Sequence, residues 1–271
     1  MMARLAAILV TILVLGLGLG GGASPARAQL LQQEGDDPVT IEADDGIEWV
    51  RDDKLYIARG NAKAVRGTLT VSADTLTAAY RAKDTGGSEV YRLEALGNVV
   101  IVSAEDRAVG DRAVYDIDQQ VIVLTGEGLS FKSGIDTITA RDSLEYWETR
   151  QLAVARGEAT ARREGQRIDA DVLTAHFGEG PNGENRIEQV DALGNVVITT
   201  PEEVVHGDEG VYDVLREVAT LEGDVRVTRG ENQLNGERAV VNLKTGVSRM
   251  LPGSKAGGRV KGLFTPEREN N

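Results

Sequence analysis

The chain has 271 residues, no cysteine, and 43 acidic against 30 basic side chains, which gives a formal charge of −13. This balance makes nucleic acid an unsuitable partner, because phosphate binding needs a basic surface. The lack of cysteine excludes a fold held together by disulfides, so stability has to come from an aliphatic core and from backbone pairing.

The N-terminus has the form of a secretory signal peptide. Arg4 precedes an apolar, Gly-rich run over residues 5–22, and Ala26-Arg27-Ala28 forms an A-x-A cleavage site. We expect cleavage after Ala28, followed by a mobile leader over residues 29–37. No later segment has the ~20 consecutive apolar residues that span a bilayer. The alternative is an N-terminus that is kept as a membrane anchor.

Residues 38–252 are an internal duplication with an offset of 97 residues. The run Ala95–Ile101 returns unchanged as Ala192–Ile198, and Gly110-Asp111 returns as Gly207-Asp208. A shorter period of about 30 residues lies within it, marked by a small residue that is usually followed by a charged one. These marks are Ala43, Ala73, Gly110, Ala140, Ala170, Gly207 and Gly236. Self-similarity of this kind indicates stacked units that share one core.

The apolar residues inside each unit alternate with a period of two, which is typical of strands. A second strand type follows Gly-Asn or Gly-Asp, as at Gly97-Asn98, where these residues supply a turn or bulge before β-branched residues. No window between residues 38 and 250 has a convincing helical period. We therefore predict an all-β fold, a solenoid-like stack of antiparallel strands in repeated units of about 30 residues.

Such a stack repeats the same apolar positions along its interior and leaves unpaired backbone groups at its two edges, which favours edge-to-edge self-association. The repeat predicts ten positions that line the interior of the stack and could contact a lipid: Leu76, Ala78, Tyr80, Val99, Ile101, Leu173, Ala175, Phe177, Val196 and Ile198. For each of them alone, core packing explains the residue as well as contact with a lipid. The inward face of the second strand type stays open, because Val100 and Val197 are apolar too.

Catalytic and metal-binding interpretations find little support. His176 and His206 align one repeat earlier with Ala79 and Val109, so the repeat requires neither histidine. Adjacent acids such as Asp44-Asp45 point to opposite faces of a strand and cannot act as a carboxylate pair. The Gly-rich residues 178–183 lack the Gly-Lys-Ser/Thr ending of a phosphate loop and are interpreted as a hairpin loop. We predict a protein that is no enzyme and has no cofactor or metal site.

The sequence resembles the LptA/OstA-like family of lipopolysaccharide (LPS) transport proteins over residues 38–250. The resemblance rests on A-D-x-L-x-A-x-Y strands (Ala73–Tyr80, Ala170–Phe177), on L-x-A-x-G-N-V-x-I (Leu93–Ile101), on G-D-x-x-x-Y-D (Gly110–Asp116, Gly207–Asp213) and on L-x-G-x-V (Leu221–Val225). It implies a twisted, partly open β-jellyroll that holds acyl chains in its interior. It also implies a periplasmic protein that stacks end to end and links an inner-membrane LPS extraction complex to an outer-membrane LPS translocon.

Two further expectations accompany this resemblance. The acidic composition argues against a basic cluster that clamps the lipid's phosphates, so head groups are expected outside, with divalent ions as one way to balance them. Residues 253–271 are Gly-rich and basic, then polar, and are predicted to be a disordered tail; docking of residues 259–264 on a neighbouring edge is the alternative.

The competing hypotheses are a ligand-free structural or adhesin-like β-solenoid, and an inner-membrane-anchored relative of the same transport machine. Another glycolipid could also replace LPS as cargo.

Overall fold

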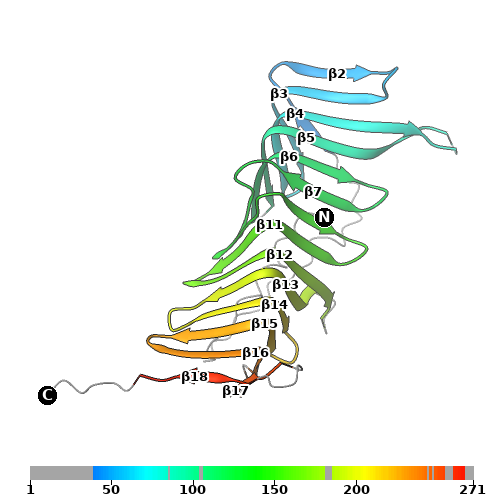
Figure 1. Cartoon of the computed structure of the whole chain (residues 1–271). Helices are drawn as coiled ribbons and strands as arrows, with labels where there is room; N and C mark the ends of the chain where they lie inside the picture. The colour runs from blue at the N-terminus through cyan, green and yellow to red at the C-terminus, as the bar shows by residue number, and fades with distance from the viewer. Residues whose placement is uncertain are drawn as a thin grey trace, which may run out of the picture.

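The computed structural model describes residues 39–84, 86–103, 106–180, 185–242, 244–245, 247–253 and 259–265. The predicted signal peptide and leader lie outside these residues. The elements in the described part are strands, joined antiparallel in a single 18-stranded sheet, which confirms the all-β prediction. Figure 1 shows an elongated molecule whose strands lie across its long axis, from β2 at one end to β17 and β18 at the other. The jellyroll implied by the family resemblance stays a prediction.

The strands differ in length, and the long ones alternate with pairs of short ones. In chain order they are β1 (Thr40–Glu42), β2 (Gly46–Val50), β3 (Leu55–Arg66), β4 (Leu69–Ala82), β5 (Ser88–Ser103), β6 (Asp106–Asp116), β7 (Val121–Thr125), β8 (Ser130–Ser133), β9 (Asp136–Thr139), β10 (Ser143–Trp147), β11 (Leu152–Arg163), β12 (Gln166–Glu179), β13 (Asn185–Thr199), β14 (Val204–Asp213), β15 (Val218–Arg229), β16 (Asn232–Asn242), β17 (Val247–Leu251) and β18 (Lys261–Leu263). None of the described residues forms a helix that could cross a membrane.

The sheet is divided along its length into two walls, because each long strand pairs differently in its two halves. The first half of β3 pairs with β2, and its second half pairs with β1. The register between β3 and β4 shifts between these halves. Wall A consists of the short strands β2, β7, β10 and β17 and of those halves of the long strands that pair alongside them. Wall B consists of the short strands β1, β8, β9 and β18 and of the remaining halves of the long strands.

The corner between the walls is formed by the Gly-Asn and Gly-Asp pairs found in the sequence. Gly97 and Asn98 both have positive φ, 77° and 48°, and so do Gly194 and Asn195, 77° and 50°. A Cβ on Gly97 would collide with the carboxylate of Asp74 on the next strand. The amide of Asn98 donates to both carboxylate oxygens of Asp74, at 3.1 and 3.0 Å. At four of the seven marks, the charged residue of the "small then charged" pair is the aspartate that faces a corner glycine: Asp74, Asp111, Asp171 and Asp208.

The duplication is visible in the element bounds. β3 and β11 begin and end 97 residues apart, and so do β4 and β12. The copies differ at one corner, because β7 and β8 are separate strands in the first copy, whereas the equivalent β15 of the second copy is continuous. If each pair of short strands is counted as one interrupted strand, the described part of the chain contains two copies of six strands and the beginning of a third.

The C-terminal stretch differs from its prediction. Lys261–Leu263 forms β18, which pairs with Gln233–Asn235 of β16, and the backbone N–H of Thr265 donates to Asn232 Oδ1 at 2.9 Å. The reason is that β17 covers only the wall A half of β16, so the wall B half needs another strand to satisfy its backbone groups. Residues 254–258 and 266–271 lie outside the described part.

Candidate functional site

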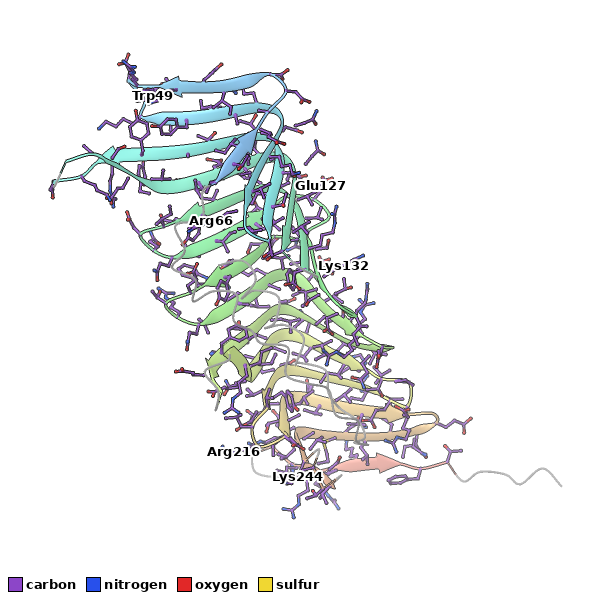
Figure 2. The ribbon with its side chains drawn as sticks, turned by 180° about the vertical axis from the view of Figure 1, so that it is seen from behind. Trp49, Arg66, Glu127, Lys132, Arg216 and Lys244 are labelled. Carbon is purple, nitrogen blue, oxygen red and sulfur yellow. The ribbon has the colours of Figure 1, made fainter. Side chains whose placement is uncertain are left out.

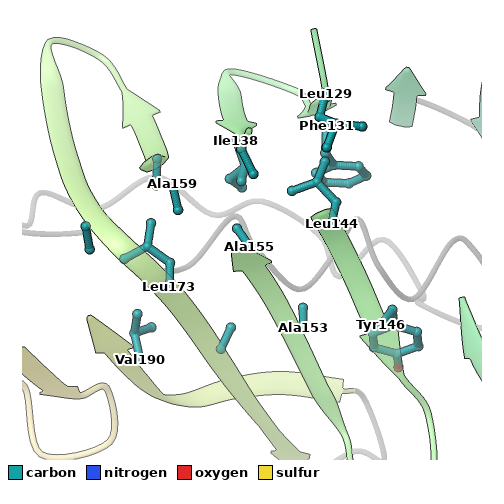
Figure 3. Packing of buried hydrophobic residues seen from close by; sticks show 14 of the residues in the cluster. Leu129, Phe131, Ile138, Leu144, Tyr146, Ala153, Ala155, Ala159, Leu173 and Val190 are labelled. Atoms are coloured by element: carbon teal, nitrogen blue, oxygen red, sulfur yellow. The ribbon is translucent and has the colours of Figure 1, made fainter. Parts of the chain in front are cut away.

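The space between the walls is lined by apolar side chains that follow one another across the strands. One row crosses wall A by direct pairing of neighbours: Trp49, Tyr56, Ala78, Leu93, Tyr115, Ile122, Tyr146, Ala153, Ala175, Val190 and Tyr212. The row is covered in the middle of the molecule, where Tyr146 is 1% exposed, and open near the N-terminal edge, where Trp49 is 54% exposed. Figure 3 shows the covered part, with Tyr146, Ala153 and Ala155 on wall A and Phe131 and Ile138 on wall B.

The structure places most of the sequence-predicted lining residues in one buried cluster. Its fully buried members are Val99, Ile101, Leu173, Ala175, Phe177 and Val196, and Leu76 and Ile198 pack against them. Val99 is 0% and Ile101 5% exposed, whereas Val100 between them is only half-buried. The corner bulge therefore turns Val99 and Ile101, not Val100, toward the interior.

Ala78 and Tyr80 lie near the open N-terminal end and are only half-buried. Tyr80 belongs to a small aromatic group, since its ring centroid lies 5.0 Å from that of Tyr56 and its hydroxyl accepts a hydrogen bond of 2.8 Å from Trp49 Nε1. Phe177, at the equivalent position one copy later, contacts Tyr146 and is buried. Equivalent residues thus differ in exposure because only the second copy has strands on both sides.

A cleft opens between the walls at the centre of the molecule. Wall A contributes Ile122, Leu124 and Leu144, wall B contributes Ile101, Ala108 and Phe131, and the polar residues Ser103, Asp106 and Arg107 lie at its wall B rim. Its empty volume is about 460 Å³, part of it open to solvent. The space that a water-sized molecule can occupy there is only about 40 Å³, far below the roughly 300–1,000 Å³ of small-molecule sites, so the lining of the cleft, and not its size, suits an apolar ligand.

Sequence reasoning missed the central residues of this cleft, those on β7, β8 and β10. These strands are short and do not repeat the motif of the long strands, so the 97-residue offset did not highlight them. A signal was present, because Leu144 and Tyr146 alternate with polar residues and occupy the positions of Ile47 and Trp49 in the first copy.

A nearly buried ion pair lies between the walls. Arg163 donates two hydrogen bonds to Asp136, at 2.6 and 2.7 Å, and their side chains are only 11% and 5% exposed. Burial raises the pKa of Tyr115 well above its ordinary value, and the nearby carboxylate of Glu148 raises it further. Tyr115 therefore stays neutral even at an alkaline pH at which an exposed tyrosine would ionise.

His176 is paired with an aspartate on the neighbouring strand. His176 Nε2 lies 2.6 Å from Asp191, whose other oxygen accepts from Gln189, so this histidine has a partner that the sequence did not reveal. The pair lies on the outer face of wall A, because Ala175 and Phe177 on either side of His176 face the interior. Within the described part of the chain, no three His, Cys, Asp or Glu side chains gather in a way that would hold a metal ion.

Comparison with known proteins gives the family. The model of the family described as "LptA/(LptD N-terminal domain) LPS transport protein" matches residues 40–141 and again residues 137–247. The chain belongs to this family. The two matches meet at β9, so each copy of the duplication corresponds to one copy of the family's domain, and together they cover most of the chain.

Two relatives are similar to parts of the chain. An uncharacterised protein of Rhizobium meliloti is 32% identical over 116 residues, which are 41% of this chain and 62% of that protein, so the chain spans less than two thirds of its length. The crystal structure of LptH, described as the LptA-homologous periplasmic component of the lipopolysaccharide transport device of Pseudomonas aeruginosa, shares 18% identity. That match covers 48% of this chain and 95% of LptH, with a TM-score of 0.41.

Proposed function

We propose that this protein is a periplasmic, non-enzymatic bridge segment that binds LPS by its acyl chains between the two walls and carries it from the inner to the outer membrane. Its partners would be the inner-membrane extraction complex and the outer-membrane translocon of LPS. The observation that carries the proposal is the continuous apolar lining, repeated across both family domains and opening into a cleft at the centre. The signal peptide predicted over residues 1–28 agrees with export.

The energetics of a lipid in water favour this arrangement. Each exposed methylene costs on the order of 0.8 kcal/mol, so a lipid with several acyl chains crosses an aqueous gap only inside an apolar shelter. Transfer also requires that no single position hold the lipid much more strongly than the next. Equivalent aliphatic side chains at an offset of 97 residues, such as Ile101 and Ile198, repeat the same apolar lining in the second copy.

The two edges support end-to-end association. In the described part of the chain, β1 and β2 pair only with β3 at one end of the sheet, and β17 and β18 pair only with β16 at the other, so both edges present unpaired backbone groups. Apolar side chains accompany them at both ends: Ile41, Ile47 and Trp49 on the first edge, and Val247, Leu251 and Leu263 on the second. Strand addition between copies or to a partner of the same fold would bury these side chains.

A second candidate, a packed solenoid without ligand, is favoured by one observation. The central corner positions are completely covered, since Val99 and Ala159 are 0% exposed. In that case the cleft between Ile122 and Phe131 would be a packing defect that holds nothing.

In-cell photo-crosslinking separates the two candidates. A photo-reactive amino acid in place of Ile122 points into the cleft, whereas the same residue in place of Val123 points to the opposite face of β7. We expect an LPS adduct at position 122 and none at position 123. Equal labelling at both positions, or none at position 122 in a folded and exported protein, would exclude the lipid-binding proposal.

A further inference from the structure

A row of cations lies near the rim of wall B, although the chain as a whole is acidic. Direct strand pairing places Arg107 on β6 opposite Lys132 on β8, Lys132 opposite Thr137 on β9, Thr137 opposite Arg162 on β11, and Arg162 opposite Arg167 on β12. We call Arg107, Lys132, Arg162 and Arg167 the basic ladder. All four side chains are exposed, and Figure 2 shows Lys132 about midway along the molecule.

Most of this charge is not balanced by neighbouring acids. Arg167 forms an ion pair with Asp169 at 2.6 Å, but Arg107, Lys132 and Arg162 have no ion pair with any residue in the described part of the chain. Arg107 directly faces Lys132, and Arg162 directly faces Arg167. Like charges placed opposite each other on neighbouring strands destabilise a sheet. The ladder therefore costs stability unless an anion lies against it.

The fold itself does not need these cations. One copy away, the positions of Arg162 and Arg167 are occupied by Val65 and Thr70, which pair in the same way. The position of Arg107 is occupied by Val204 in the second copy, whereas the position of Lys132 keeps a cation there, Arg229. The duplication keeps the apolar lining and the corners but has the ladder only at the centre of the molecule, which points to a role outside folding.

The ladder adjoins the central cleft. Arg107 lines the cleft itself, at the rim where its polar lining is found. Lys132 follows Phe131, whose ring lines the same cleft. Arg107 and Lys132 both lie within a few residues of a strand end. At the other end, Arg162 and Arg167 border a shallow hollow that also contains Ile135, Arg163 and the acidic Glu164. Lys132 and Arg162 start from the outer face of wall B, because Phe131 and Ala161 beside them face the interior, so a head group would have to pass over the hairpin rim to reach them.

We infer that the basic ladder binds the phosphate groups of the lipid whose acyl chains occupy the cleft, an inference that rests on the proposed function. Four strand spacings separate Arg107 from Arg167, which is about 19 Å at the usual distance between strands. This length accommodates a head group that carries more than one phosphate. Arginine is suited to the task because its planar fork donates to two phosphate oxygens at once. The acidic composition led us to expect no basic cluster for the phosphates. Net charge, however, does not reveal where cations gather on the surface, and the ladder is a local gathering of four.

The test compares the full-length mature protein with two double variants of equal charge change. Arg107→Gln/Arg162→Gln removes two cations of the ladder, and Arg226→Gln/Arg249→Gln removes two exposed arginines from β15 and β17 as the control. Binding is measured to lipid A with both phosphates, to the same lipid after enzymatic removal of the phosphates, and to inorganic phosphate. Thermal unfolding of each variant checks that the fold is intact, and the ladder variant is expected to be no less stable than the wild type.

We expect the ladder variant to bind phosphorylated lipid A about tenfold more weakly, the loss typical of a hydrogen bond to a charged group. Its affinity for the dephosphorylated lipid is expected to stay that of the wild type. The difference should shrink at high ionic strength, and the control variant should match the wild type.

Two results would overturn the inference while leaving the proposed function intact: an equal loss for both lipids, or no loss for either. Binding of inorganic phosphate as tight as that of the lipid would assign the ladder to free phosphate instead. Failure of the wild-type protein to bind either lipid would remove the proposed function and the inference together.

Discussion

The corner glycines can be tested by replacing Gly97 with alanine. The backbone there has φ 77°, and an added Cβ would collide with the carboxylate of Asp74. Left-handed backbone costs an L-residue about 1–2 kcal/mol. Displacing a packed neighbour costs about 1–3 kcal/mol, and losing the hydrogen bonds from Asn98 to Asp74 adds about 1 kcal/mol. We therefore expect Gly97→Ala to lower the free energy of unfolding by about 4 kcal/mol.

The matched control is Gly230→Ala, in the hairpin between β15 and β16. Gly230 also has positive φ, 56°, but a Cβ there meets nothing within 4 Å. Only the backbone cost should remain, about 1 kcal/mol. The assay is urea unfolding followed by circular dichroism. Adding Asp74→Ala to Gly97→Ala should recover part of the loss, because it removes the colliding carboxylate. Equal losses at the two glycines, or no recovery in the double variant, would refute the corner argument.

Two further predictions concern buried charge and pH. Asp136→Asn leaves the arginine of a nearly buried ion pair uncompensated and should cost about 3 kcal/mol in urea unfolding, and a loss below about 1 kcal/mol would show that the pair is solvated. Glu145 is partly desolvated, but hydrogen bonds from Arg156, Trp147 and Ser143 hold its pKa below the ordinary 4.5. Its contribution is therefore complete above pH 4.5 and is lost as the pH falls through the lower folded-state pKa. Glu145→Gln should flatten the acid side of the stability profile, and a profile of unchanged slope would contradict this assignment.

Much of the fold could be predicted because the sequence repeats. Period-two alternation gave the strands, and the Gly-Asn pairs gave the positions where their direction changes. The sequence could not show that Asp74 faces Gly97, since that contact depends on the register of two strands. Register also settled which of Val99 and Val100 faces inward, because a bulge shifts the alternation by a step that the pattern of apolar residues leaves ambiguous.

The site was less predictable than the fold, for two physical reasons. The cleft residues Ile122, Phe131 and Leu144 come from short strands without a repeat signal, and they meet only because β7 and β8 pair with the two halves of β6. The basic ladder was hidden by net charge, since its four residues are separated in sequence and come together only by pairing across β6, β8, β9, β11 and β12. Composition gives only the net charge of the whole chain, whereas strand pairing determines which charged side chains lie next to one another.

The junction between the two copies indicates what a contact between two molecules would bury. β10 and β2 are equivalent strands, but β7 covers β10, and no described strand covers the outer side of β2. Tyr146 on β10 is 1% exposed for this reason, and Trp49, at the same position on β2, is 54% exposed. If copies stack edge to edge through β2, Trp49 should become as dry as Tyr146.

The chain has two tryptophans, so Trp147→Phe leaves Trp49 as the only reporter. Its fluorescence should shift to shorter wavelength as the protein concentration rises and oligomers form in sedimentation velocity. The Trp49→Phe variant keeps only Trp147, which lies on β10 between β7 and β11 and away from both edges of the sheet, and should show no shift. Oligomers that form without any change at Trp49 would mean that copies associate through another surface, and the internal junction would then be no guide to the contact between molecules.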